Sequence, residues 1–147
     1  MGVNVLFSDR VRVVGSIDPD ANAAGALTSA YADMSNYDQV MAIVQTGTLG
    51  TAATVDMKLV QATDSSGTGV KDITGKAITQ LVKATNDDDQ AIINCRADEL
   101  DTANGFNHIA IVHTVGTATS DSSAILLGSC ARYEPATDLA SVVEIIA

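Results

Sequence analysis

Hydrophobic and polar residues alternate in short stretches of this chain, most clearly between residues 37 and 62. The first run there, residues 39–46, is apolar on both of its faces. One face carries Val40, Ala42 and Val44, and the other carries Met41 and Ile43. Apolar residues on both faces are typical of a strand that is covered on both sides. We therefore predict a central strand that the rest of the fold encloses.

The second run, residues 53–61, alternates with period two. Val55, Met57 and Leu59 face one way, and Thr54, Asp56 and Lys58 face the other. This pattern predicts a half-buried strand with one solvated face. The connection between the runs contains Gly47 and Gly50, which can take the positive φ that tight hairpin loops need. The two runs are thus predicted to form a β-hairpin.

Further strand-like runs follow at nearly regular spacing and are separated by turns rich in glycine, aspartate and asparagine. They lie at residues 26–32, 73–82, 91–97, 106–115 and 124–132. One helical or 3₁₀ turn is predicted within residues 97–106. Short strands with such turns favour an all-β fold, an antiparallel β-sandwich of jelly-roll-like type with about eight strands.

The chain divides into three predicted parts. Residues 1–24 form an N-terminal arm or an edge strand, interrupted by the segment around Pro19. Residues 25–136 form the β-sandwich domain. Residues 137–147 form a C-terminal tail that fits either a short helix or a strand, and the β-branched run VVEII favours the strand.

Composition narrows the classes of function. The chain has 147 residues and a formal net charge of -10, and its eight Lys and Arg residues are scattered. Nucleic-acid binding needs clustered basic side chains, so no nucleic-acid partner is expected. No apolar run is long enough to cross a bilayer, and the first residues lack the pattern of a secretory signal, so no membrane partner is expected.

The residues that could carry chemistry form no recognisable catalytic set. His108 and His113 would point to opposite faces of one strand, and His113 shares its face with apolar residues, which indicates a core histidine. Cys95 and Cys130 lie in strand-like runs and are expected to be small buried residues. We predict no catalytic residues, no cofactor-binding residues and no metal ligands, and we predict that the chain is not an enzyme.

Two loops are candidate ligand sites. Asp87, Asp88 and Asp89 are the densest acidic cluster, but they lack the alternating spacing of a known calcium loop. A solvated turn is the favoured interpretation, and cation binding by residues 86–89 stays open. Residues 64–69, DSSGTG, give a weak phosphate-loop pattern, because no lysine follows in the required spacing.

Three segments carry a resemblance to a known family: QTGTLGTAATVDMKL, KDITGKAITQL and FNHIAIVHTVGTATSDSSAILL. Over residues 30–136 the chain resembles small virion proteins of tailed bacteriophages, in particular head decoration (cement) proteins. The matching segments are packing and turn features, so they carry over no functional residue.

The resemblance implies a structural protein that binds the major capsid protein on the outside of the shell after synthesis in the host cytoplasm. It also implies a homo-oligomer, with a trimer as one option. We expect residues 1–20 and loops such as 64–72 to contact the shell. A tail or fibre module is the first alternative. A secreted or surface ligand-binding sandwich is the second, although so few aromatic residues disfavour sugar recognition.

Overall fold

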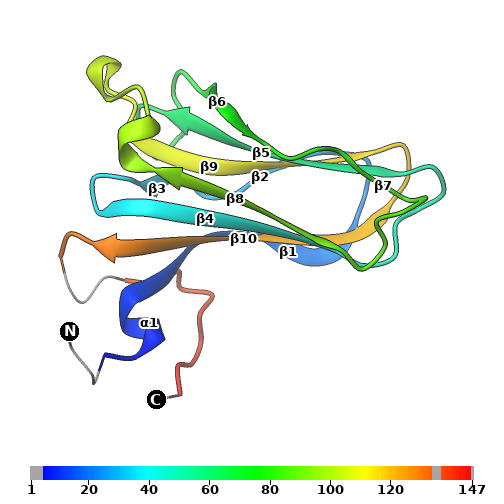
Figure 1. The fold of residues 1–147 in the computed structure, drawn as a ribbon, viewed down its shortest axis with the longest axis horizontal. Coiled ribbons are helices and arrows are strands. Elements are labelled where there is room, and N and C mark those ends of the chain that lie inside the picture. Colours follow the sequence, from blue (N-terminus) through cyan, green and yellow to red (C-terminus); the bar gives the residue numbers. More distant parts are fainter. Residues whose placement is uncertain (1–4, 134–136, 147) are drawn as a thin grey trace.

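The computed structural model describes residues 5–133 and 137–146, and these form a sandwich of two antiparallel β-sheets (Figure 1). Sheet I contains four strands, in the order β1 (Val11–Asn22), β10 (Ser120–Ala131), β4 (Tyr37–Thr46) and β8 (Gln90–Arg96). Sheet II has the order β2 (Gly25–Thr28), β9 (His108–Gly116), β5 (Thr54–Ala62) and β6 (Lys71–Ala77). Two short strands complete sheet II, where β3 (Ala32–Asp33) pairs with β9 and β7 (Leu81–Val82) pairs with β5. The predicted all-β sandwich is confirmed, with ten strands rather than eight.

Strand pairing in the sandwich is nested. β1 pairs with β10, β2 with β9, β4 with β8, and β5 with β6. Strands that pair in this way wrap around the core together, as in a jelly roll. The predicted hairpin of residues 37–62 is therefore wrong, because β4 lies in sheet I and β5 lies in sheet II.

The connection between β4 and β5 crosses from one sheet to the other, and its glycines serve that crossing. A Cβ atom added at Gly50 would lie 2.4 Å from the carbonyl oxygen of Thr119. Gly50 is therefore required by a close approach of backbone to backbone rather than by a hairpin turn. Gly47 closes the same corner, since its N–H donates to the carbonyl of Asp121 at 2.8 Å.

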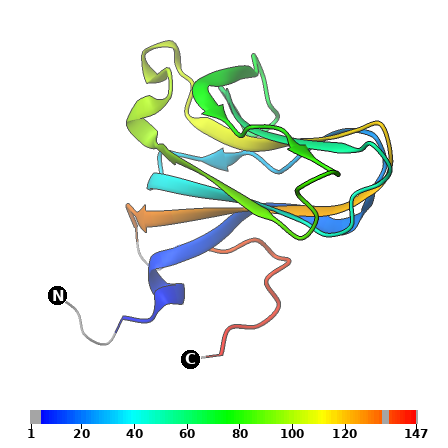
Figure 2. The same ribbon diagram turned by 45° about the vertical axis from the view of Figure 1, so that its right-hand side comes forward.

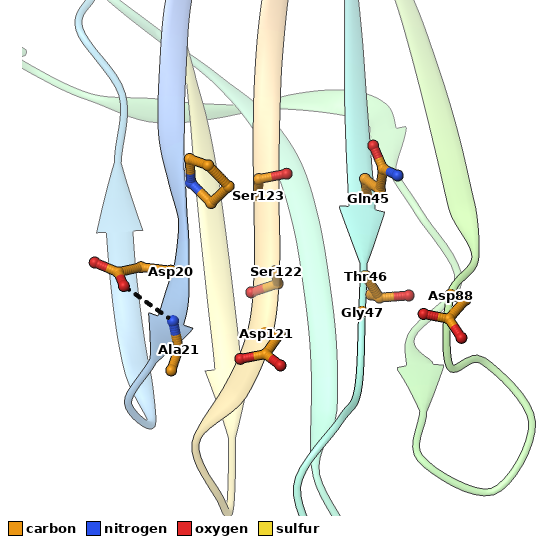
Figure 3. A pocket seen from close by; sticks show the side chains of 10 residues that line it. Asp20, Ala21, Gln45, Thr46, Gly47, Asp88, Asp121, Ser122 and Ser123 are labelled. Atoms are coloured by element: carbon orange, nitrogen blue, oxygen red, sulfur yellow. Dashed lines mark hydrogen bonds between the residues drawn. The ribbon is translucent and has the colours of Figure 1, made fainter.

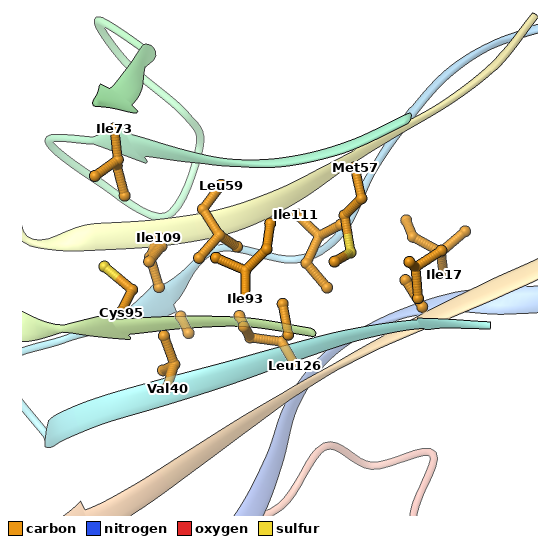
Figure 4. Packing of buried hydrophobic residues seen from close by; sticks show 14 of the residues in the cluster. Ile17, Val40, Met57, Leu59, Ile73, Ile93, Cys95, Ile109, Ile111 and Leu126 are labelled. Carbon is orange, nitrogen blue, oxygen red and sulfur yellow. The ribbon is translucent and has the colours of Figure 1, made fainter. Parts of the chain in front are cut away.

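The core lies between the inward faces of the two sheets (Figure 4). Leu59 and Ile111 from sheet II meet Leu126 from sheet I, and all three side chains are fully buried. On β5 the predicted alternation is confirmed, with Val55 and its partners two residues apart facing the core. Burying each Leu or Ile side chain of this kind contributes about 1.5–3 kcal/mol.

Three short helical turns lie at the ends of strands. They are α1 (Phe7–Arg10), η1 (Ala97–Glu99) and η2 (Thr102–Asn104), of which the last two confirm the helical turn predicted within residues 97–106. Gly105 ends η2 with a φ of 83°, a conformation that glycine adopts without strain. The turns precede β1 and join β8 to β9, so they lie outside the core.

The first described residues and the tail lie on the same side of sheet I (Figures 1 and 2). Residues 11–22 of the predicted arm form β1, the edge strand of that sheet, while residues 1–4 lie outside the described part of the chain. Asp138 accepts a hydrogen bond from the Val13 N–H at 2.7 Å, and the Leu139 N–H donates to the Val13 carbonyl at 3.0 Å.

The tail continues the sheet for only one step. Residues 137–146 contain no helix or strand, so the preference for a strand there is wrong. The Val142 N–H turns back to donate to the Leu139 carbonyl at 2.9 Å, which ends any pairing with β1. The boundary drawn at residue 136 falls on residues 134–136, outside the described part.

Candidate functional site

An acidic hollow lies at the end of sheet I, where β4 ends and β10 begins (Figure 3). It has a volume of about 420 Å³ and is lined by three carboxylates, those of Asp20, Asp88 and Asp121. The carboxylates come from separate segments and are spread along the end of the sheet (Figure 3). Among the described residues, no three His, Cys, Asp or Glu side chains are grouped closely enough to hold a metal ion. We assign no ligand to this hollow.

The acidic run 87–89 is tied into the corner of the fold by its own hydrogen bonds. Asp87 pairs with Lys83 and accepts the Leu49 N–H at 3.0 Å. The hydrogen bond from Lys83 holds the pKa of the Asp87 carboxyl below its ordinary value. The Asn86 side chain donates to Asp89 at 2.8 Å. The run therefore acts as a brace between two loops. Of the predicted solvated turn, Asp88 is exposed, whereas Asp87 and Asp89 are only partly exposed.

The two histidines lie in different surroundings, and only one of them is fully buried. His113 on β9 is 0% exposed, which confirms the predicted core histidine. Its Nε2 lies 2.9 Å from the Ser122 Oγ, and burial lowers the pKa of its imidazole. His108 is half-buried at the start of β9 and contacts the Asn107 side chain at 2.7 Å. The structure does not bring them together into one site.

The loop that gave a weak phosphate-binding pattern is closed by its own aspartate. The Asp64 carboxylate accepts the N–H groups of Ser66 at 2.9 Å and Thr68 at 3.1 Å. A phosphate-binding loop needs such N–H groups to point at the ligand, and here they already have an anionic partner. Gly67 packs so closely that an added Cβ would lie 2.8 Å from the Tyr31 ring. This loop is a structured turn.

The cysteines differ from each other, and neither forms a disulfide. Cys95 is buried, as predicted, and burial raises the pKa of its thiol to about 11, with a further contribution from Glu99. Such a thiol is a poor nucleophile because little of it ionises at neutral pH. Cys130 is exposed, so the prediction that it is buried is wrong. It has a φ of 53° at the end of β10, where the strand stops pairing regularly.

The outer faces of the two sheets have opposite character. The outward residues of sheet II include Asp56 and Lys58, which contact Gln80 at 2.7 Å and Asp72 at 2.7 Å. That face is charged and suited to water. The outward residues in the middle of sheet I are apolar, although they belong to the same acidic chain.

We name the apolar part of sheet I the apolar face, and define it as Met41, Ile43, Ile92, Ile125 and Leu127. Ile43 lies opposite Ile125 on one side and opposite Ile92 on the other, and Met41 lies opposite Leu127. Ile92 is 55% exposed and the other four side chains are partly exposed. The prediction of a strand covered on both sides is therefore wrong for β4, since its second face is covered only in part. Phe7 of α1 lies beside Met41, and Ile43 stays partly exposed.

Small hollows mark both ends of the apolar face. One of about 180 Å³ is lined by Phe7 of α1 together with Met41 and Leu127. The other, of about 260 Å³, lies beside Ile43 and Ile125. The pattern of residues 39–46 shows the apolar second face of β4, but it does not show that this face stays partly exposed in the folded chain.

Exposed apolar side chains are concentrated at the ends of the described chain. Seven of the ten large apolar residues that are exposed among the described residues lie there: Val5, Leu6, Phe7, Tyr133, Val143, Ile145 and Ile146. The tail side chains are very exposed, at 94% for Val143 and 86% for Ile146. Apolar surface gathered in this way marks an interaction site more often than a catalytic one.

Comparison with known proteins identifies no family. No protein-family model matches the chain, and a search of curated proteins finds no match. A solved structure from Bacillus endospore appendages, described as a novel family of disulfide-linked pili, is similar over 88% of this chain and 98% of that chain. Its sequence identity is 17% and its TM-score is 0.31, values that carry no inference about function. Across the described residues, none of the helices has the length and apolar character needed to span a membrane.

Proposed function

We propose that this chain is a structural virion protein that binds and stabilises a phage capsid shell from the outside, as a head decoration protein does. The sequence resemblance over residues 30–136 supports the choice of a virion. The observation that carries the proposal is the gathering of exposed apolar side chains at both ends of the described chain, beside one sheet of a filled sandwich. A protein whose role is adhesion needs such a surface.

The segment that we assign to the shell is the N-terminal one. Leu6 and Phe7 are 44% and 76% exposed, and they precede the edge strand β1. A segment of this kind can insert between neighbouring capsid subunits and bury its apolar side chains there. Each copy then adds interface area that opposes separation of the subunits.

The test uses purified capsids that lack the protein. Wild-type chain is mixed with them and the capsids are sedimented, and we expect the chain to co-sediment. Replacing Leu6→Ser and Phe7→Ser should weaken binding by about tenfold or more, because apolar area is lost from the contact. The control is Leu27→Ser, since Leu27 is also exposed, at 39%, but lies on β2 of sheet II, outside residues 1–20 and the loop 64–72.

Two results would overturn the proposal. One is failure of the wild-type chain to sediment with the capsids. The other is binding that the Leu27 control weakens as much as the terminal variant does. If a labelled copy is instead imaged on the tail of assembled particles, the alternative of a tail or fibre module takes its place.

A further inference from the structure

We propose that two copies of this chain pair through the apolar face of sheet I, with the C-terminal tail of each copy packing against the other. The inference goes beyond the virion role, since it concerns the purified chain and needs no capsid. It starts from the contrast between the two outer faces. The face of sheet II has charged residues that water solvates, whereas the face of sheet I has rows of Ile, Leu and Met.

The charge of the face favours a second copy over a charged partner. Four rows cross β10, β4 and β8, and their members are Ser123, Gln45 and Gln90; Ile125, Ile43 and Ile92; Leu127, Met41 and Asn94; and Ser129, Gln39 and Arg96. In these rows only Arg96 is charged, and Asp98 lies 3.1 Å from it. A chain with a net charge of -10 repels its own copies wherever carboxylates would meet. These rows contain no Asp or Glu, and the Asp18 carboxylate lies to one side, in the hollow beside Ile43 and Ile125. Two copies can therefore approach over the rows with little of that repulsion.

The shape of the face also suits its own copy. Twisted sheets of the same hand stack face to face about 10 Å apart, with side chains interdigitating, as the two sheets of a sandwich do. The uncharged polar residues of the first and last rows, such as Gln45 and Gln39, would form the hydrogen-bonding rim of such a contact.

The area of the face explains why the tail is included. The three strands that carry the rows, about 4.8 Å apart and over seven residues of about 3.4 Å each, give a flat face of roughly 340 Å². A stable pair usually buries about 800 Å² on each partner. The remainder must come from neighbouring apolar segments on the same side, and the tail supplies Val143 and Ile146, which are almost fully exposed in the single chain. The hollows of about 180 and 260 Å³ at the ends of the face can receive such side chains.

The experiment is sedimentation velocity of the purified full chain over a range from about 1 to 500 µM, with circular dichroism to show that each variant is folded. We expect the wild-type chain to reach twice the mass of one chain within this range. Ile92→Lys should raise the dissociation constant about tenfold or more, because it places a charge in the apolar row that Ile92 forms with Ile43 and Ile125. Ile92 is exposed at a sheet edge, so this variant should fold. The matched control is Val70→Lys, which changes a similarly exposed residue elsewhere and should leave the dissociation constant unchanged.

A second variant tests the tail separately. Val143→Asp with Ile146→Asp should also weaken pairing about tenfold, since it removes part of the buried area and adds like charges. A wild-type chain that stays monomeric throughout the range, a trimer in place of a pair, or pairing that neither variant weakens would overturn the proposal. A pair that does not bind capsids removes the virion role and leaves this inference standing, whereas a monomer that binds capsids does the reverse.

Discussion

His113 and Ser122 join the two sheets across the core, with the histidine Nε2 2.9 Å from the serine Oγ. They lie on consecutive strands, β9 and β10, which belong to opposite sheets. Ser122 Oγ also accepts a hydrogen bond from the Asn22 side chain at 3.2 Å. The other ring nitrogen of His113, Nδ1, is buried without a hydrogen-bond partner among the described residues. The imidazole is therefore held in a place that has no partner for a second N–H.

This arrangement predicts that acid weakens the fold through His113. Burial lowers the pKa of the folded imidazole below the ordinary value of 6.5, so the unfolded chain binds more protons as the pH falls through that value. The free energy of unfolding should therefore be fully present above pH 6.5 and should decrease below it, by at most about 1.4 kcal/mol per pH unit. Urea unfolding measured between pH 8 and pH 5 checks this. His113→Phe should remove the decrease and His108→Gln should keep it, and equal behaviour of the two variants would refute the assignment.

The two cysteines should react at very different rates. Cys130 is exposed, whereas Cys95 is buried with a thiol pKa raised to about 11. A thiol reagent added to the native chain at pH 8 should label one cysteine quickly, and Cys130→Ser should abolish that fast phase. Cys95→Ser should leave it intact. Rapid labelling of the Cys130→Ser variant before unfolding would show that the core opens at Cys95.

Gly50 should tolerate no side chain. A Cβ atom there would come within 2.4 Å of the Thr119 carbonyl oxygen in the neighbouring loop, and backbone cannot move away as easily as a side chain can. Gly50→Ala should lower the free energy of unfolding by about 1–3 kcal/mol in urea unfolding. The control is Thr48→Ala, an exposed residue of the same loop, which should change it by less than about 0.5 kcal/mol. A neutral Gly50→Ala would mean that the two loops are farther apart than described.

The acidic corner should depend on Lys83 and not on calcium. Asp87 is paired with Lys83 and with the Leu49 N–H, and Asp89 accepts from Asn86, so these carboxylates already have partners. Thermal melts with millimolar calcium or with a chelator should coincide. Asp87→Ala should lower the melting temperature, because it frees the Leu49 N–H and removes the brace between the loops. Asp88→Asn, in the same run, is the control, because Asn also tolerates the φ of 60° at this position. A rise in melting temperature with calcium would contradict this account.

Strand positions and the buried face of each strand could be predicted from the sequence, because alternation of apolar residues follows directly from the pleat. That is why β5, the core position of His113 and the helical turn before Gly105 agree with the prediction. Pairing could not be predicted in the same way. Gly47 and Gly50 fit a hairpin and a crossing between sheets equally well, and only the distance to Thr119 separates the two.

The second face of β4 shows a different limit. An apolar face in the sequence predicts that another element covers it, but the pattern does not show whether that element belongs to the same chain. In the structure, Met41 and Ile43 instead face outward next to Ile125 and Leu127. The exposure of Cys130 could not be predicted from alternation either. The φ of 53° at Cys130 itself breaks the alternation at the end of its strand-like run.

Because β1 pairs with β10, β1 cannot join its sheet during synthesis until β10 has been made. Among the described strands β1 leaves the ribosome first, and its partner β10 leaves it last. At about 5–20 residues per second, β1 waits roughly 5–20 seconds before its partner exists. Its edge could meet other nascent chains in that interval, and Asp18, Pro19 and Asp20 in the middle of β1 are residue types that block such strand-to-strand contacts. The same segment that later completes sheet I thus protects the nascent chain from strand-to-strand contacts.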